Sequence, residues 1–251
     1  MSTPLLAIDG LSKSFGALRV TDDVSLAVRA GELHALIGPN GAGKTTLIHQ
    51  LSGILPSDAG RVVFDGTDVT ALSLAARTRR GLVRSFQITS ILPGFTALEN
   101  VALAAQARSG SSFRFIGPAA LEAALNATAL SALDDVGIAA RGHVRAGLLS
   151  HGEKRLLELA IAIAAAPKLL LLDEPLAGLG QEETSACIAL LNRLKQRFTI
   201  VLVEHDMDAV FALADRVSVL VHGRVLATGL PAGIRANPDV RIAYLGDEEA
   251  G

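Results

Sequence analysis

Apolar runs of strand length alternate with segments of helical spacing along most of the chain. Residues Leu33–Ile37 form a continuous apolar run, as expected for a strand covered on both faces. Strand patterns return at residues 169–172, 199–203 and 217–221, and a helical pattern lies between the first two, at 181–197. Strands that alternate with helices indicate βαβ units, so the pattern predicts an α/β fold with a mostly parallel sheet.

The N-terminal part adds antiparallel features to this pattern. Residues 5–15 and 24–28 have strand patterns, and the second alternates apolar and polar positions before a turn. Within residues 61–69, Asp65-Gly66 stands between two apolar runs, which is a hairpin signal. We therefore predict an antiparallel β edge beside the parallel core.

The middle of the chain has a different pattern, dominated by alanine and leucine. The apolar spacing is helical in Ala97–Arg108 and in 119–136, and a segment rich in serine and glycine separates the two. We predict that residues 1–251 form one domain, in which an α/β core receives an inserted helical lobe. The core would comprise 1–95 and 166–251, and the lobe 96–165.

Composition narrows the class of protein. The length of 251 residues and an apolar content of 50% allow a sizeable core, and the net charge of -2 gives no support to a nucleic-acid binder with a basic surface. The single cysteine, Cys187, excludes an internal disulfide and fits a reducing compartment. Residues 1–10 lack the pattern of a secretory signal. The longest apolar region, 156–172, is interrupted by charged residues and a proline, so no membrane span is expected.

A glycine-rich segment joins the strand at Leu33–Ile37 to a helix predicted at 44–51. It reads Gly38-Pro39-Asn40-Gly41-Ala42-Gly43-Lys44-Thr45-Thr46 and matches G-x-x-x-x-G-K-[ST] in its required strand–helix context. Glycines let successive backbone N–H groups point into one concavity, and the helix N-terminus adds positive potential for phosphate. These residues are the predicted nucleotide site, with Lys44 on the β- and γ-phosphates and the Thr45 hydroxyl on Mg²⁺. The alternative is a plain strand–turn–helix junction with a solvated lysine.

A second candidate lies where the apolar run 169–172 ends in Asp173-Glu174-Pro175. Parallel sheets bind ligands beyond the carboxyl ends of their strands, where the phosphate loop also lies. Asp173 could then hold Mg²⁺ through a water molecule, and Glu174 could orient or deprotonate the water that attacks the γ-phosphate. The alternative is a solvated acidic turn.

Four further features flank the phosphate loop and the acidic strand. Phe15 precedes the loop, Gln87 follows it, Ser150-His151-Gly152-Glu153 lies just before the acidic strand, and His205 follows that strand. In this order, which spans nearly the whole chain, they resemble motifs of the ABC ATPases. The corresponding motifs are the adenine-stacking aromatic residue, the Q-loop glutamine, the signature sequence and the switch histidine.

The resemblance implies a P-loop NTPase of ABC type with a RecA-like core, ATP and Mg²⁺ as cofactors, and ATP hydrolysis. It implies that Gln87 and His205 act with Glu174 in catalysis, and that Thr45, Gln87 and Asp173 are the metal ligands. It also implies that Ser150, His151, Gly152 and Glu153 contact the nucleotide held by a partner subunit.

Each of these motifs also has a simpler interpretation. Ser150 and Glu153 have the spacing of a capping box, which needs no function beyond starting a helix, and both interpretations can hold together. Phe15 alone would more often be a core residue, although base–aromatic stacking is worth about 1–3 kcal/mol. His205 alone could be a hydrogen-bonded histidine at the end of a buried strand.

Several segments resemble more narrowly the ATP-binding subunits of branched-chain (hydrophobic) amino acid importers. They are Arg84-Ser85-Phe86-Gln87, the run from Gly94 to Val101, Leu149 to Glu153, Asn237-Pro238-Asp239-Val240 and Ala243-Tyr244-Leu245-Gly246. The ATPase of lipopolysaccharide export shares part of the C-terminal pattern, and import of urea, short amides or other amino acids stays open. The chain departs from the usual family pattern at three positions: His151 and Glu153 replace glycine and glutamine, and Gly180 replaces the aspartate of the D-loop.

By this resemblance, two ATPase subunits pair head to tail and sandwich ATP between one phosphate loop and the other signature helix. The second subunit could be a copy or a related chain. Residues 89–98 are the predicted contact with transmembrane permease subunits, and a periplasmic binding protein would take part indirectly. The chain would then act peripherally at the cytoplasmic face of the plasma membrane.

Two other classes of function remain as alternatives. One is an ABC protein acting on nucleic acid or ribosomes, against which the slight negative net charge, the single ATPase unit and the absence of a heptad run argue. The other is a regulator that binds nucleotide without turnover, against which Glu174 argues. We therefore expect no nucleic-acid partner.

Overall fold

The computed structural model describes residues 3–85, 91–108 and 119–248, with side-chain surroundings left aside for 119–122 and 244–248. At its centre is a six-stranded sheet with the order β10-β9-β3-β8-β7-β6. Only the pairing of β10 with β9 is antiparallel in this sheet. Its strands are β3 (Leu33–Ile37), β6 (Leu82–Arg84), β7 (Leu169–Asp173), β8 (Thr199–Val203), β9 (Arg216–Val221) and β10 (Arg224–Gly229). The predicted α/β class with a mostly parallel core is confirmed.

A four-stranded antiparallel sheet with the order β2-β1-β4-β5 forms the predicted β edge. Its strands are β1 (Leu6–Phe15), β2 (Leu18–Val28), β4 (Ala59–Phe64) and β5 (Thr67–Asp68). Asp65 and Gly66 form the turn between β4 and β5, with φ of 49° and 73°, as the hairpin signal predicts. Strand β2 begins earlier than the predicted residue 24, because its first half pairs with β1 through register shifts that interrupt the alternating pattern.

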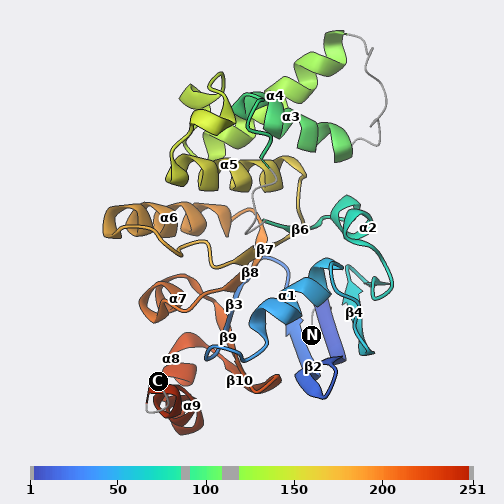
Figure 1. The fold of residues 1–251 in the computed structure, drawn as a ribbon, viewed down its shortest axis with the longest axis vertical. Coiled ribbons are helices and arrows are strands. Elements are labelled where there is room, and N and C mark those ends of the chain that lie inside the picture. The colour runs from blue at the N-terminus through green and yellow to red at the C-terminus, as the bar shows by residue number, and fades with distance from the viewer. Residues whose placement is uncertain (1–2, 86–90, 109–118, 249–251) are drawn as a thin grey trace.

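Helices cover the parallel sheet and form a separate layer at one end of the molecule (Figure 1). Those around the sheets are α1 (Lys44–Ser52), α2 (Leu74–Arg79), α6 (Gln181–Leu194), α7 (Met207–Leu213), α8 (Pro231–Ala236) and α9 (Pro238–Glu248). Helix α6 ends before the predicted residue 197, and a turn follows it. The separate layer, here called the helical lobe, comprises α3 (Ala97–Arg108), α4 (Ala119–Asp135), the short 3₁₀ segments η1 (Ala139–Arg141) and η2 (Ala146–Leu148), and α5 (His151–Ala164). The domain limits at residues 95/96 and 165/166 stay a prediction.

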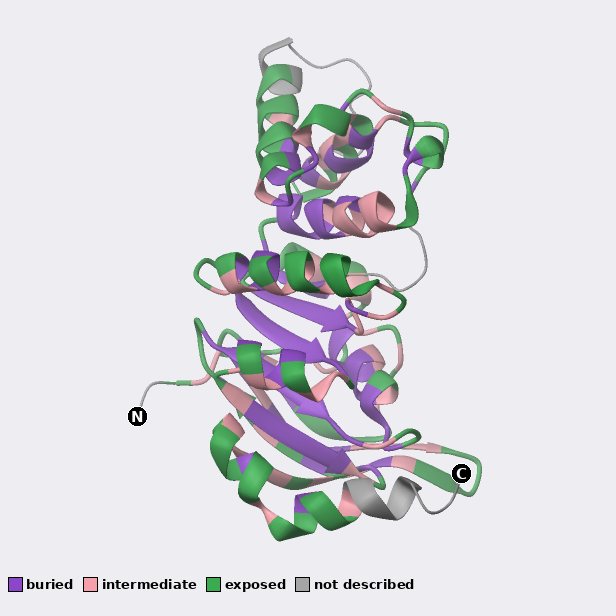
Figure 2. Cartoon of the chain, turned by 90° about the vertical axis from the view of Figure 1, so that its left-hand side faces the viewer, coloured by how far each residue is buried: buried purple, intermediate pink, exposed green. Residues whose placement is uncertain are grey.

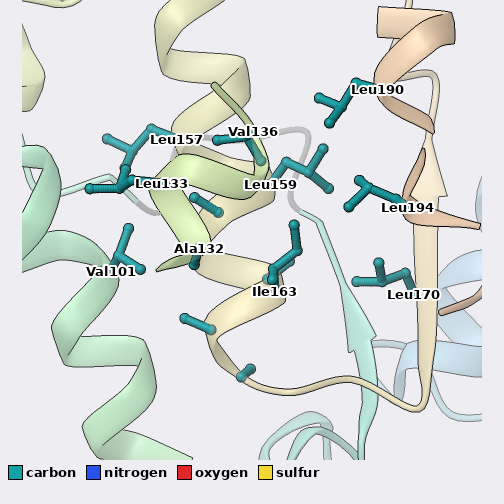
Figure 3. Packing of buried hydrophobic residues seen from close by; sticks show 14 of the residues in the cluster. Val101, Ala132, Leu133, Val136, Leu157, Leu159, Ile163, Leu170, Leu190 and Leu194 are labelled. Atoms are coloured by element: carbon teal, nitrogen blue, oxygen red, sulfur yellow. The ribbon is translucent and has the colours of Figure 1, made fainter. Parts of the chain in front are cut away.

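Buried side chains run through both the lobe and the sheet. Strands β3, β7 and β8 are buried along their whole length, which explains their unbroken apolar sequences (Figure 2). Helix α5 carries Leu159 and Ile163 toward α6 and the sheet, where Leu190, Leu194 and Leu170 belong to the same apolar cluster (Figure 3). The lobe is therefore joined to the core by an apolar layer. In the described part of the chain, no helix is long and apolar enough to cross a membrane.

Candidate active site

The glycine-rich segment forms the turn between β3 and α1, as its sequence context predicts. Gly43 is the N-cap residue of α1 and has φ of 100°, and no side chain caps the helix. The first turn of α1 contains no acidic residue. The N–H groups at this helix end are therefore not covered by a capping side chain, and their positive potential favours a bound anion.

Glycine is required at two positions of this turn because other backbone segments approach it closely. A Cβ atom at Gly38 would overlap the carbonyl oxygen of Leu220 in β9, and one at Gly43 would overlap the carbonyl oxygen of Val20 in β2. The neighbouring strands thus hold the turn in place on both sides, which fixes the directions of its N–H groups.

We expect Gly43→Ala to lower both the melting temperature and the affinity for ATP. The added methyl group would collide with Val20, and the φ of 100° is strained for alanine. Gly31→Ala is the matched control, because Gly31 also has positive φ, at 78°, but its added Cβ would meet nothing within 4 Å. The control should lose about 1–2 kcal/mol of stability from strain alone and keep its ATP affinity. Equal losses of affinity in the two variants would contradict this account.

Lys44, the first residue of α1, turns its side chain back over the loop. Its Nζ donates to the carbonyl oxygens of Gly38 and Pro39, at 2.6 and 2.9 Å, and the residue is only 8% exposed. The alternative of a solvated lysine therefore does not describe this residue. Thr45 is exposed and Thr46 is half-buried, so the Thr45 side chain is accessible from solvent.

Asp173 is the buried last residue of β7, and it pairs with an arginine that the sequence analysis left without a role. Arg84 Nη2 donates to Asp173 Oδ2 at 2.9 Å, and both side chains are buried. Burial raises the pKa of Asp173, and the guanidinium of Arg84 opposes that shift. The Arg84 Nε atom has no hydrogen-bond partner among the described residues. Asp173 is thus a buried, paired carboxylate rather than part of a solvated turn.

Glu174 follows directly and has an unusual backbone conformation, with φ of 49°. Its N–H donates to the carbonyl oxygen of Val203, the last residue of β8. Its carboxylate is 30% exposed, and Oε1 lies 3.9 Å from Nδ1 of His205, whose side chain is 63% exposed. The structure therefore brings Glu174 and His205 together at the same sheet edge, in contact with solvent.

Glu204 is a further residue of this edge that the sequence analysis missed. Its buried carboxylate accepts hydrogen bonds from the backbone N–H of Leu176, at 2.8 Å, and of His205, at 3.1 Å. Burial raises the pKa of Glu204. The signal was present, because Glu204 directly follows β8, a buried strand beside β7, much as Asp173 stands at the end of β7. Through these two hydrogen bonds, Glu204 holds together the segment after β7, which carries Glu174, and the segment after β8, which carries His205.

The signature segment begins α5, and its capping-box interpretation is confirmed. Ser150 Oγ accepts from the N–H of Glu153, and Glu153 Oε2 accepts from the N–H of Ser150. The other carboxylate oxygen, Glu153 Oε1, lies 2.7 Å from Nε of Arg141. These hydrogen bonds and Arg141 hold the pKa of Glu153 below its usual value. His151 is exposed, and Gly152 lies close to Glu183 of α6.

The structure does not bring the signature segment to the phosphate loop of the same chain. Figure 1 shows α5 in the helical lobe and α1 against the sheet, apart from each other. Gly180, the departure in the D-loop, is the N-cap of α6, and its N–H donates to Glu183 Oε2. A second chain is needed if the signature is to meet a nucleotide on a phosphate loop.

Phe15 lies at the exposed end of β1. The residue is 51% exposed, so it is not a core residue, and Lys13 Nζ lies 5.7 Å from its ring centroid. The ring is thus available for stacking, in a hairpin whose second strand, β2, touches the phosphate loop at Val20. The predicted Gln87 lies outside the described residues, as do 89 and 90 of the predicted permease contact.

The oxygen donors predicted for Mg²⁺ are of the type that suits an ion arriving with a nucleotide. Within residues 3–85, 91–108 and 119–248, no group of three or more His, Cys, Asp or Glu side chains could hold a metal ion. Mg²⁺ is usually bound by one or two carboxylates together with substrate phosphates and water. A hydroxyl at Thr45 and a carboxylate at Asp173 are donors of that kind, so the chain offers part of a site that phosphate oxygens would complete.

Comparison with known proteins places this site in a family. A family model described as "ABC transporter" matches residues 21–177, and one described as "Branched-chain amino acid ATP-binding cassette transporter" matches residues 224–250. The chain is 37% identical to the high-affinity branched-chain amino acid transport ATP-binding protein BraF of Pseudomonas aeruginosa, over 98% of this chain and 100% of that protein. It is 38% identical to LivG of Salmonella typhimurium, which carries the same description, with the same coverage.

Solved structures agree with these sequence matches. The ADP conformation of MJ1267, an ATP-binding cassette of an ABC transporter, matches with a TM-score of 0.84 and 29% identity, over 98% of this chain and all of that one. A nucleotide-free ATP-binding cassette from an ABC transporter matches with a TM-score of 0.83 and 28% identity, over 96% and 99% of the two chains. The predicted resemblance is confirmed: this chain is an ATP-binding cassette, with ATPase activity, of the ABC transporter family.

Proposed function

We propose that this chain is the ATP-hydrolysing subunit of an importer for branched-chain or other hydrophobic amino acids. The observation that carries the proposal is similarity over 98% of the chain to ATP-binding proteins of branched-chain amino acid transport. The match of residues 224–250 to the branched-chain family model adds support from a segment outside the nucleotide site. The chain would work peripherally at the cytoplasmic face of the plasma membrane.

In the proposed reaction, the phosphate loop and Lys44 hold the triphosphate of ATP, and Phe15 stacks on its adenine. The N–H groups at the start of α1 and the Lys44 ammonium face the phosphates, where negative charge develops during phosphoryl transfer. Glu174 orients the attacking water and accepts its proton, and His205 lies beside that carboxylate at the exposed edge. Mg²⁺, held by Thr45 and Asp173 with Gln87, would neutralise charge on the phosphate oxygens.

The separation of α5 from α1 supports a sandwich of two ATPase subunits. In such a pair, Ser150, His151 and Gly152 of one subunit approach the nucleotide of the other. Because Ser150 Oγ accepts a hydrogen bond within its own subunit, its hydroxyl proton stays available for a phosphate oxygen. Glu153 acts by ordering this helix end, and Arg141 balances its negative charge.

The described part of the predicted permease contact, residues 91–98, exposes apolar side chains, as a hydrophobic docking surface requires. Leu92 and Phe95 are each 45% exposed, whereas Ile91 is buried. Asn100 holds the segment in place, since its side chain accepts from the N–H of Leu92 and donates to the carbonyl oxygens of Leu92 and Thr96. The apolar side chains of Leu92 and Phe95 therefore stand out from an ordered backbone, as a partner helix would need.

We expect Leu92→Asp to reduce co-purification with the co-expressed permease subunits, because a carboxylate would have to be desolvated in an apolar contact. Leu226→Asp is the matched control, since Leu226 is 43% exposed on β10. Both variants should keep the ATPase rate of the isolated chain. If Leu92→Asp retains the permease subunits as well as Leu226→Asp does, residues 91–98 are not the contact.

Transport in proteoliposomes tests the proposed function as a whole. The assembled transporter, with its periplasmic binding protein, should take up leucine, isoleucine or valine only when ATP is supplied on the side of this chain. Uptake of urea or short amides instead would identify a different cargo, and movement of lipopolysaccharide outward would overturn import. Salt-dependent binding of RNA or DNA by the purified chain would favour the alternative of a nucleic-acid-associated ABC protein.

A further inference from the structure

Arg155, in the first turns of α5, reaches out of the helical lobe to the segment that follows β7. Its Nε donates to the carbonyl oxygen of Pro175 at 3.1 Å. Its Nη2 donates to the carbonyl oxygens of Glu174, at 3.0 Å, and Ala177, at 2.8 Å. One side chain of the signature helix thus binds three backbone carbonyls at and just after the proposed general base.

The backbone that Arg155 holds is strained at Glu174. A non-glycine residue with φ of 49° costs on the order of 1–3 kcal/mol and persists only where surrounding contacts fix it. Three hydrogen bonds fix Glu174: its N–H donates to Val203, its carbonyl oxygen accepts from the N–H of Ala177, and the same oxygen accepts from Arg155. Of these three hydrogen bonds, the one from Arg155 is the one that comes from the helical lobe.

The chemistry of this contact requires arginine. The guanidinium donors lie in one plane and in fixed directions, so a single group can serve several carbonyls of a tight turn. Within the described residues, the Arg155 guanidinium forms no ion pair with a carboxylate, so its bonds to the turn are its main polar contacts. A lysine would offer one ammonium on a flexible stem and could not reproduce this geometry.

We propose that Arg155 is a positioning residue for hydrolysis, which sets the orientation of Glu174 through its backbone carbonyl. The proposal rests on the proposed function, in which Glu174 is the general base. Because Ser150, which would face the partner's nucleotide, is the N-cap residue of α5, Arg155 also connects the signature helix to the general base of its own subunit's site.

Replacing Arg155 should slow turnover without weakening nucleotide binding. In Arg155→Met, we expect the kcat of the purified full chain to fall roughly 10- to 100-fold, the scale of a small misplacement of a catalytic group. The ATP affinity should stay at the wild-type value, because the Arg155 side chain binds the turn after β7 and not the phosphate loop. Arg155→Lys should recover only part of the rate.

Lys195→Met is the matched control for general loss of stability. Lys195 is likewise a partly buried cation that donates to a backbone carbonyl, that of Leu213, at the other end of α6 from the signature segment. The Lys195→Met protein should have a lower melting temperature but the kcat of the wild type. Wild-type turnover in Arg155→Met would overturn the proposal.

A double-mutant cycle distinguishes a positioning role from a merely structural one. If Arg155 acts through Glu174, adding Arg155→Met to Glu174→Gln should change the residual rate very little, because the group being positioned is already gone. That residual rate is measured by the release of radiolabelled phosphate over hours. An equal fold-loss in the two backgrounds would overturn the proposal. Failure of the proposed function is a separate result: if the chain served another transporter, uptake of leucine, isoleucine or valine would fail, while Arg155→Met would still lower ATP turnover.

Discussion

Glu174→Gln is expected to lower the ATP turnover of the purified protein by roughly 10²–10⁴-fold, the usual contribution of a general base. The amide is nearly the same size as the carboxylate but cannot accept a proton from the attacking water. The Glu174 side chain stands at the exposed edge of the sheet, so the substitution leaves no unpaired charge in the core. ATP affinity should be unchanged, because the phosphate loop is untouched.

Glu182→Gln is the control for this prediction. Glu182 is exposed in the first turn of α6, so its replacement by glutamine makes the same chemical change away from the sheet edge. It should keep wild-type turnover, measured as phosphate release at saturating ATP. Hydrolysis retained in Glu174→Gln would remove Glu174 from the role of base, and loss of ATP binding in that variant would show that the fold had been damaged instead.

Lys44→Ala should reduce the affinity for magnesium ATP by between about 30-fold and a few thousandfold. Removing one partner of a buried, hydrogen-bonded charge pair costs about 2–5 kcal/mol. Lys44 is buried over the loop, where its ammonium now binds the carbonyl oxygens of Gly38 and Pro39. Titration calorimetry with a non-hydrolysable ATP analogue measures the loss directly.

An exposed lysine provides the comparison for Lys44. Lys168 pairs with Asp65 at the surface, and the two side chains are 57% and 51% exposed. Lys168→Ala should bind the analogue as the wild type does. If Lys44→Ala retained wild-type affinity, the loop would not be the nucleotide site, and hydrolysis and transport would have no basis in this chain.

Elements with strong local signals were predicted closely from sequence. Strands β3 and β8 and helix α3 have the predicted limits, because apolar runs and helical spacing each span the whole element. The phosphate loop was predicted because glycine, lysine and threonine are each required by local geometry. Strand β6 was not predicted, since Leu82–Arg84 is too short for any periodicity, and its place in the sheet is set by pairing with β7.

Contacts between distant segments could not be read from the sequence. Arg84 meets Asp173 only because β6 and β7 pair in parallel, which places the two strand ends side by side. Arg155 reaches the turn after β7 only because α5 packs across the core on its apolar face. The exposure of Phe15 followed from the family resemblance and not from periodicity, because the strand pattern of β1 does not fix which face meets solvent at its end.

The apolar layer between α5 and α6 has a mechanical consequence. Contacts among Leu159, Ile163, Leu190 and Leu194 are non-directional, so these helices can slide by small amounts while the side chains stay buried, as in shear motions between packed helices. The hydrogen bonds of Arg155 are directional and resist such sliding. We therefore expect the helical lobe to pivot about the Arg155 contact, with its largest displacements at the far ends of α3 and α4.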